Sequence, residues 1–307
     1  MARRRVPAGA SSPERNRRSS ASALFLAPAV VVFIGVVLYP MAAALRMSFY
    51  DWKILPGAHS EFLGLANYGR ALRDETFWRG LLNAAAYMIL TVPVQAALGL
   101  CVALLLNSKI RMRGAFRAIY YLPVVTSWVV VSLLFQYLFS TDTGLFNWVL
   151  KDLTHLSSGN VAWLQHRWTA ILAISALGVW KGIGWSMIIF LAALQGVSEE
   201  LQEAAAIDGA RAIQRFRHVT LPAIRRTTSF VAIMLVIGGF NVFISVMLMT
   251  GGGPAGQTEV PLTYMYRQAF SFLDFGYGAA LSFLLTVVVI SVSVAQLRFF
   301  QADGDER

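Results

Sequence analysis

Long apolar runs, separated by short charged stretches, dominate the chain. Five of them carry no charged residue, and four of these five are 22–44, 81–106, 118–140 and 276–297. A fifth covers about 227–250, and a sixth, about 168–195, contains a single charge at Lys181. A helix needs about 20 predominantly apolar residues to cross the core of a bilayer, and each run is long enough. The pattern predicts an all-α membrane protein with six transmembrane helices, each apolar nearly all round.

Composition agrees with this pattern and excludes an ordinary soluble domain. Hydrophobic residues make up 57% of the 307 residues and charged residues 14%, with a mean hydropathy of +0.59, whereas about 25% of a soluble domain is charged. The net charge of +10 does not indicate a nucleic-acid partner, because the basic residues lie in short stretches that flank apolar runs. Cys101 is the single cysteine, so no intramolecular disulfide is possible.

The Lys and Arg residues are distributed unevenly between the connections. Residues 1–20 hold six, the 107–117 connection four, the 196–226 connection five and the C-terminal end two, whereas the alternate connections hold four, two and one. Cytoplasmic segments are enriched in Lys and Arg, so both termini and the 196–226 connection are expected in the cytoplasm. We expect a disordered basic arm at 1–20, a six-helix domain at 21–300 and a cytoplasmic tail at 301–307. A cleaved signal peptide is the alternative for the first run, which is longer than the usual length of about 7–15 residues.

The 196–226 connection carries signals for two short helices and a turn. Ser198 is suited to cap the first helix, and two acidic residues follow in its first turn, where the helix dipole favours negative charge. Gly209 lies where this helix would stop, because Gly adopts left-handed dihedral angles without a Cβ clash. A second helix is expected from about Arg211, and Pro222 suits the first turn of the next one. The connection therefore predicts a helix–turn–helix outside the membrane.

One extended motif runs through the same connection. It reads Glu-Ala-Ala, three residues, Gly, nine residues, Ile or Val, any residue and Leu-Pro, at positions Glu203, Ala204, Ala205, Gly209, Val219, Leu221 and Pro222. This pattern resembles the cytoplasmic coupling loop of binding-protein-dependent ABC importer permeases, which usually have Ile where this chain has Val219. The resemblance implies the type I ABC importer permease fold. It also implies that a short helix ending near Asp208 docks on a separate ATPase subunit.

Other stretches resemble the sugar-importer branch of this family, so the resemblance covers nearly the whole chain after residue 20. They are FLGLANY at 62–68, FRAIYYLP at 116–123, FLAALQ at 190–195, TGGGP at 250–254 and GYGAA at 276–280. They favour the maltose/glycerol-3-phosphate type of permease, specifically the first subunit of the usual pair. By resemblance, the substrate pathway draws on the fourth span and the middle of the fifth, at Lys181, Gly182, Trp185, Gly239 and Asn241.

Lys181 is the most informative residue inside a predicted span. A charge at mid-span costs roughly 2.5–3.5 kcal/mol on insertion scales and usually faces a cavity or a partner. Tryptophans and glycines surround it, an arrangement that suits the recognition of a sugar, and its charge would also meet an anionic glycerol phosphate. Alternatively, Lys181 reaches the outer interface or pairs with a neighbouring subunit, and Asn241 bonds across helices.

The sequence contains no group with which this chain would supply its own energy. The phosphate-binding Gly-x-x-x-x-Gly-Lys-Ser/Thr pattern is absent, and the four histidines lack metal-ligand spacing. We therefore expect no catalytic residue, no metal and no cofactor on this chain, with ATP and Mg²⁺ on partner subunits. The resemblance implies a multi-pass permease of the bacterial cytoplasmic (inner) membrane that imports a carbohydrate, polyol or glycerol phosphate. Its implied partners are a second permease subunit in a heterodimer, two copies of an ATP-binding subunit, an extracytoplasmic solute-binding protein and membrane lipids.

Two other classes of function are compatible with a chain of many spans. An ion-coupled secondary carrier of small solutes would need intramembrane acids, and the predicted spans contain none. An intramembrane enzyme would need a nucleophile or metal motif, which the sequence lacks. The aromatic residues of the external connections, such as Trp52 and Trp148, either form an interfacial belt or dock an external partner.

Overall fold

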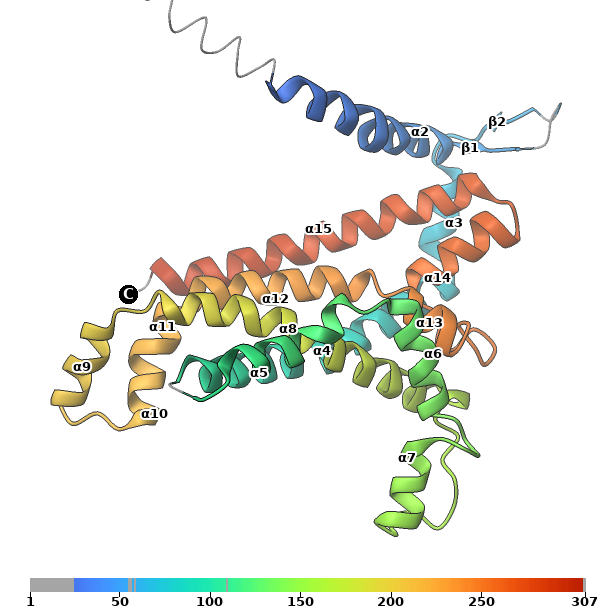
Figure 1. Cartoon of the computed structure of the whole chain (residues 1–307). Helices are drawn as coiled ribbons and strands as arrows, with labels where there is room; N and C mark the ends of the chain where they lie inside the picture. The colour runs from blue at the N-terminus through green and yellow to red at the C-terminus, as the bar shows by residue number, and fades with distance from the viewer. Residues whose placement is uncertain (1–24, 55–56, 58, 109, 306–307) are drawn as a thin grey trace, which may run out of the picture.

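Long helices lying side by side form the body of the molecule (Figure 1). The computed structural model describes residues 25–54, 57, 59–108 and 110–305. Its longest elements are α4 (Glu75–Asn107), α8 (Arg167–Gln195), α12 (Arg225–Phe240) and α15 (Phe275–Asp305). The expected arm at 1–20 lies outside the described residues, and α15 continues into the expected tail as far as Asp305.

Four helices are long and apolar enough to cross a membrane: Phe25–Met47, Glu75–Asn107, Arg167–Gln195 and Phe275–Gln301. Two further candidates are bent pairs. In the first, α5 (Arg113–Val125) and α6 (Trp128–Leu138) meet at 92°. In the second, the helical stretch Ala212–Ala223 and α12 meet at 69°. The described residues therefore contain four spans, or up to six if each bent pair is counted as one.

The third apolar run is not the single straight helix that its length suggests. Pro123 lies in the last turn of α5, and Thr126 adopts an extended backbone directly after it. The hydroxyl of Thr126 donates a hydrogen bond to the carbonyl oxygen of Pro123 over 2.6 Å. Such a local bond offers the backbone an alternative to helical pairing, so the chain turns here and α6 starts at Trp128.

The fifth run is also shorter than expected, because α12 ends at Phe240 rather than near Thr250. Gly238 and Gly239, both poor helix formers, lie in its last turn. After a short break the chain forms the separate helix α13 (Ile244–Met249).

Short elements connect the long helices, and they include one pair of two-residue strands in an otherwise helical chain. Strands β1 (Tyr50–Asp51) and β2 (Glu61–Phe62) pair antiparallel, with Tyr50 opposite Phe62. The remaining elements are η1 (Ile34–Leu38), α2 (Tyr39–Met47), α3 (Ala66–Arg73), α7 (Leu145–Trp148), η2 (Val149–Leu153), η3 (Trp163–Gln165), α9 (Glu199–Ile207), α10 (Ala212–Arg215), η4 (Phe216–Thr220), α11 (Leu221–Ala223), α14 (Pro261–Tyr266) and η5 (Arg267–Ser271).

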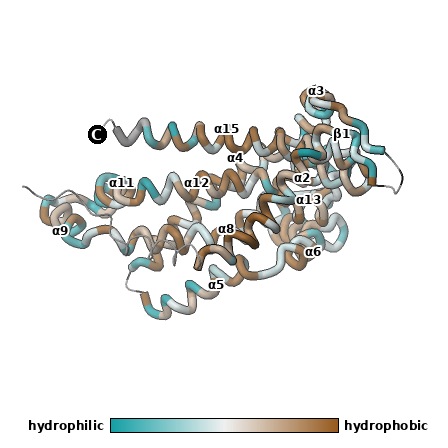
Figure 2. Tube along the Cα trace, turned by 90° about the horizontal axis from the view of Figure 1, so that it is seen from above, coloured by the Kyte–Doolittle hydropathy of each residue, from teal (hydrophilic) through white to brown (hydrophobic). Residues whose placement is uncertain are grey.

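Helix α8 lies at the centre of the packing. It packs most extensively against α4 and also contacts α5, α6 and α12. Half of the most apolar stretch of α8 is buried, whereas none of the corresponding stretch of the first helix is. Figure 2 shows hydrophobic residues along α8 and hydrophilic ones gathered around α9 and α11 at one end of the molecule. Helices α4, α5, α6 and α12 therefore pack around α8, and the long helices expose apolar residues, as expected where the solvent is lipid.

Candidate functional site

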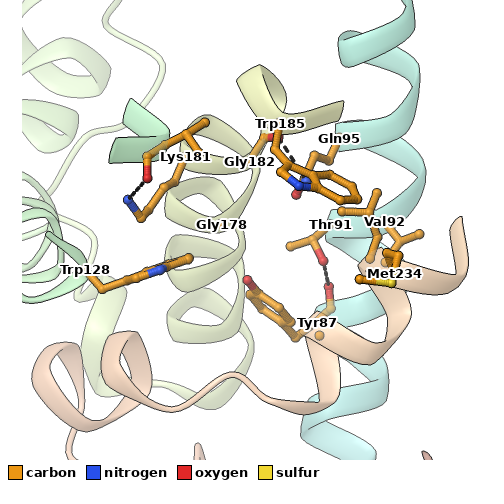
Figure 3. A pocket seen from close by; sticks show the side chains of 14 residues that line it. Tyr87, Thr91, Val92, Gln95, Trp128, Gly178, Lys181, Gly182, Trp185 and Met234 are labelled. Atoms are coloured by element: carbon orange, nitrogen blue, oxygen red, sulfur yellow. Dashed lines mark hydrogen bonds between the residues drawn. The ribbon is translucent and has the colours of Figure 1, made fainter. Parts of the chain in front are cut away.

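A cavity of about 350 Å³ lies between α4, the bend from α5 to α6, α8 and α12 (Figure 3). Its lining includes Tyr87, Thr91, Gln95, Val124, Trp128, Gly178, Lys181, Gly182, Trp185, Met234 and Gly239. Aromatic faces and a few polar groups thus converge inside an otherwise apolar helical bundle. This combination is typical of a site for a small organic ligand.

The polar groups of the cavity come mainly from one face of α4. Tyr87, Thr91 and Gln95 are four residues apart, so their side chains lie in one row along the helix (Figure 3). The Nε2 of Gln95 donates to the carbonyl oxygen of Gly182 over 3.1 Å. The hydroxyl of Thr91 donates to the backbone carbonyl oxygen of Tyr87 in the same helix over 2.8 Å. The bond from Gln95 ties the row to α8, whereas the bond from Thr91 stays within α4.

Glycines on α8 allow side chains of α4 to pack directly against its backbone. A Cβ at Gly178 would overlap the hydroxyl of Tyr87, and one at Gly182 would overlap the amide of Gln95. The space beside the aromatic rings of α8 is therefore occupied by α4 side chains rather than left open. Gly239 has the same role in α12, where a Cβ would overlap the side chain of Met88.

Lys181 lines the cavity, but its charged end is directed elsewhere. The residue is only 3% exposed. Its Nζ donates to the carbonyl oxygens of Pro123 and Thr126 over 2.7 and 2.6 Å. The Nζ also lies 4.8 Å from the centre of the Trp128 ring. The ammonium group is thus bound at the bend of the third span.

The structure gathers four of the five residues predicted for the substrate pathway, namely Lys181, Gly182, Trp185 and Gly239. Asn241 does not line the cavity: it follows the end of α12, is exposed, and donates through Nδ2 to the carbonyl oxygen of Ile237. Sequence reasoning missed the row on α4. Its signal was present, since polar residues spaced by four in an apolar run indicate a helix face turned away from lipid.

The predicted helix–turn–helix at 196–226 is present. Helix α9 ends at Ile207, and Gly209 has a φ of +80°. The amide of Gly209 donates to the carbonyl oxygen of Ala206, and that of Ala210 donates to that of Ala205 over 2.9 Å. This pair of bonds is the Schellman motif, in which glycine takes the left-handed position. Gly209 thus sets the angle between α9 and α10.

The hairpin of α9 and α10 presents an open surface. Glu203, Ala204, Asp208 and Gly209 are exposed and Ala205 is half-buried. Two isoleucines at the turn are also exposed, Ile207 at 87% and Ile213 at 79%. Exposed apolar residues beside charged ones, at the end of a hairpin, are typical of a docking surface for another protein.

A side-chain hydrogen bond joins α9 to η4, the helical segment that follows α10. The Nε2 of Gln202 donates to the hydroxyl of Thr220 over 2.9 Å. Leu221 and Pro222 follow directly, in the short helix α11. Pro222 lies in the first turn of α11, as predicted, and α12 starts just beyond it at Arg225. Only a few residues therefore separate Thr220, the bonded partner of Gln202, from the start of α12.

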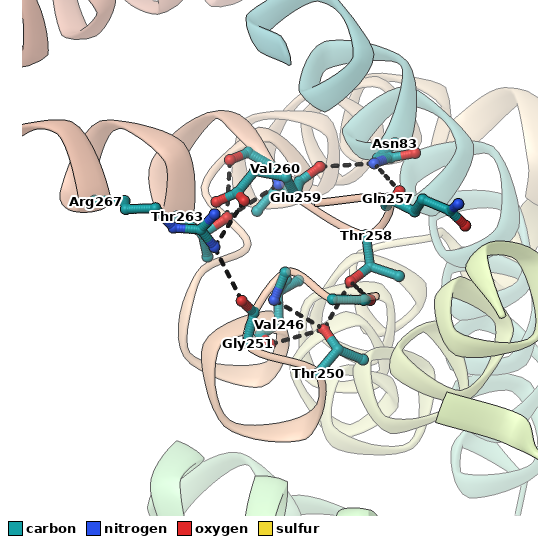
Figure 4. A network of polar contacts seen from close by, with 12 residues as sticks. Asn83, Val246, Thr250, Gly251, Gln257, Thr258, Glu259, Val260, Thr263 and Arg267 are labelled. Atoms are coloured by element: carbon teal, nitrogen blue, oxygen red, sulfur yellow. Dashed lines mark hydrogen bonds and ion pairs between the residues drawn. The ribbon is translucent and has the colours of Figure 1, made fainter. Parts of the chain in front are cut away.

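At the opposite end of the long helices, a buried polar network orders the loop between α13 and α14 (Figure 4). Asn83 of α4 donates through Nδ2 to the carbonyl oxygens of Gln257 and Glu259, over 2.8 and 2.7 Å. The carboxylate of Glu259 is fully buried and forms an ion pair with Arg267 at 2.8 Å. Burial raises the pKa of Glu259, although the positive charge of Arg267 opposes this shift. The network fixes the predicted glycine-rich turn against α4.

Among the described residues, no group of three or more His, Cys, Asp or Glu side chains is placed to hold a metal ion. The absence of a metal or cofactor from this chain stays a prediction.

Comparison with known proteins identifies clear relatives. A family model described as "Binding-protein-dependent transport system inner membrane component" matches residues 95–302. The arabinooligosaccharides transport system permease protein AraP of Halalkalibacterium halodurans is 36% identical over 277 residues, covering 89% of this chain and 85% of that protein. The lactose transport system permease protein LacF of Rhizobium radiobacter is 34% identical over 278 residues, covering 89% and 91%.

Solved structures show the same fold. A bacterial ABC transporter that imports the acidic polysaccharide alginate contains a chain with a TM-score of 0.79 and 22% identity, covering 94% of this chain and 98% of that chain. A second structure, of a bacterial alginate ABC transporter in complex with a periplasmic protein bound to an alginate pentasaccharide, gives a TM-score of 0.77 and 23% identity, covering 92% and 94%.

Proposed function

This chain belongs to the family of binding-protein-dependent transport system inner membrane components, and we propose that its central cavity is part of the passage for an oligosaccharide. It is a membrane-embedded permease subunit of an ABC importer. The observation that carries the proposal is the cavity itself, where aromatic faces from two helices meet a row of hydrogen-bonding groups. Sugars present both apolar ring faces and hydroxyl groups, so this lining suits them.

The names of the relatives support a neutral carbohydrate as the substrate class. AraP is a permease for arabinooligosaccharides and LacF for lactose. We do not favour an anionic glycerol phosphate, because the one cationic side chain on the described cavity wall, Lys181, donates to backbone carbonyl groups instead of facing a ligand. An ion-coupled carrier is not favoured either, since the family to which the chain belongs works with binding proteins.

The proposed assembly contains a second permease subunit, two copies of an ATP-binding subunit and an extracytoplasmic solute-binding protein. ATP and Mg²⁺ are held by the ATP-binding subunits, so this chain hydrolyses nothing itself. The exposed hairpin of α9 and α10 is the proposed docking surface for one of them. The first helix, apolar and unburied, offers a face for the second permease. Closure of the ATP-binding subunits would then rock the helices between inward- and outward-open states.

The proposed topology has six spans in the bacterial inner membrane, with both termini and the hairpin in the cytoplasm. It is supported by the excess of Lys and Arg in the corresponding connections. It is also supported by the arrangement of the helices. The N-terminal end of the first helix and the C-terminal end of α15 both point toward the side that carries α9 (Figure 1).

The proposal is tested by uptake of labelled oligosaccharides into vesicles that hold the assembled transporter. Gln95→Leu should raise the KM for uptake about tenfold, because the loss of one buried hydrogen-bonding group costs roughly 1–1.5 kcal/mol. Val94→Leu is the matched control, since Val94 is the preceding residue, is exposed and lies outside the cavity lining. Unchanged uptake by Gln95→Leu, or uptake that continues without ATP, would contradict the proposal.

A further inference from the structure

The break between α5 and α6 leaves backbone carbonyl groups at the end of a helix inside an apolar run. The last four carbonyl groups of any helix lack partners within it. In water they bond to solvent, but in a bilayer each unsatisfied group costs several kcal/mol. The bend of 92° therefore requires a donor from another part of the chain.

Lys181 of α8 supplies this donor. Its Nζ lies 2.7 Å from the carbonyl oxygen of Pro123, 2.6 Å from that of Thr126 and 3.4 Å from that of Val124. An ammonium group has three N–H bonds, and these three oxygens match them. A positive charge at this position also meets the negative end of the α5 dipole.

The same ammonium group contacts the helix on the other side of the break. It lies 4.8 Å from the ring centre of Trp128, the first residue of α6, a distance suited to a cation–π contact. Close packing of α5 on α8 supports the arrangement, because a Cβ at Gly184 would overlap the carbonyl oxygen of Tyr120. Lys181 therefore joins both arms of the bend to α8.

We propose that Lys181 is a positioning residue that holds the third span bent and thereby fixes Val124 and Trp128 as one wall of the cavity. Its ammonium group takes the place of the backbone N–H groups that the break removes. The positive charge of Lys181 therefore interacts with backbone carbonyl groups of the protein and does not select the substrate. The role of the cavity as a passage rests on the proposed function. The bend and the contacts of Lys181 do not depend on which sugar is transported.

The proposal is tested by hydrogen–deuterium exchange of residues 119–131 in the assembled transporter, measured without sugar. Lys181→Met keeps the length and apolar stem but removes the donor, so exchange there should rise about tenfold or more. Lys181→Arg keeps a donor and a charge and should restore slow exchange. Thr91→Val, which removes a polar group from the same cavity away from the bend, should leave exchange at 119–131 unchanged.

Transport measurements separate this role from direct contact with substrate. Lys181→Met should raise the KM for uptake while leaving the ratio of KM values for a neutral and an acidic sugar as in the parent. A selective change for the acidic sugar would overturn the proposal, as would unchanged exchange at 119–131 in Lys181→Met. Should Lys181→Met fail to assemble, Lys181→Gln, with a shorter donor, takes its place and should give faster exchange than Lys181→Arg. Equal exchange in these two variants would also overturn the proposal.

Discussion

The hydroxyl of Tyr277 donates a hydrogen bond to the carboxylate of Asp74 over 2.5 Å, although the two residues are 203 positions apart. The hydroxyl of Tyr264 donates to the same carboxylate oxygen, also over 2.5 Å. The other oxygen of Asp74 caps α4 by accepting from the amides of Thr76 and Phe77. One side chain thus ties the start of α4 to α14 and α15, on the side of the molecule away from the hairpin.

We expect Asp74→Asn to lower thermal stability in a pH-dependent way. Burial alone would raise the pKa of Asp74, but the hydrogen bonds from Tyr264, Tyr277 and the capped amides outweigh it and lower the pKa below 3.8. An acid with a lowered pKa stabilises the folded state above its unfolded pKa, and this contribution is lost as pH falls through the folded value. The difference in Tm between parent and variant should therefore be largest near pH 7 and shrink below about pH 4.

The measurement is a thermal melt of the transporter in lipid nanodiscs between pH 7 and pH 3. Asp51→Asn is the matched control, because Asp51 pairs with Lys53 at the exposed surface, where solvent screens the charges and the pair adds little to stability. A Tm difference for Asp74→Asn that stays constant across this range would show that the carboxylate charge is not what stabilises the junction.

A second prediction concerns the turn of the hairpin of α9 and α10, the proposed docking surface. Gly209→Val should abolish uptake and ATP-driven coupling while leaving expression intact, because a β-branched residue at φ +80° is strained. The cost is conformational rather than steric, since a Cβ at Gly209 would meet no atom within 4 Å. Gly114→Ala is the matched control: it is also open on all sides but has no positive φ. Normal transport by Gly209→Val would contradict the role of this turn.

A charge reversal tests the docking surface itself. Glu203 is exposed on α9, in the proposed docking surface. Glu203→Lys should therefore leave the melting temperature of the isolated permease unchanged but reduce co-purification of the ATP-binding subunit severalfold. Glu61→Lys, which changes an exposed acid on the β-hairpin far along the chain, serves as the control. Equal recovery of the ATP-binding subunit with both variants would argue that another surface makes the contact.

The sequence predicted elements better where local chemistry decides them than where tertiary contacts do. The turn at Gly209 follows from the left-handed preference of glycine, and its position was confirmed. The break at Thr126 was missed, because an uninterrupted apolar run from 118 to 140 has the length of one straight span. Besides the local bond from Thr126, the break has a donor in Lys181, 55 residues away, which no local pattern specifies.

Only part of the candidate cavity could be predicted from the sequence, because the rest depends on tertiary contacts. Gly182 and Trp185 were found through the resemblance, and the structure places both at the cavity. That Gln95 enters beside Gly182 depends on how α4 packs on α8, which no local pattern specifies. Asn241 lies outside the cavity because α12 ends one residue earlier, so its predicted place in the pathway rests on the resemblance alone.

The last prediction concerns the buried ion pair between Glu259 and Arg267. Arg267→Met removes the cation and leaves a fully buried carboxylate without its charged partner, at a cost of about 1–3 kcal/mol or more. Burial already raises the pKa of Glu259, and the loss of Arg267 should raise it further. For an acid with a raised pKa, stability falls as pH increases from the unfolded value of 4.5 toward the folded value. Arg267→Met should therefore melt at a lower temperature than the parent at pH 8, with a smaller difference at pH 5. Adding Glu259→Gln should recover most of the loss at pH 8, because the neutral amide needs no cation. If the double variant were as unstable as Arg267→Met, the lost bond from Arg267 to the carbonyl oxygen of Gly251 would account for the effect instead.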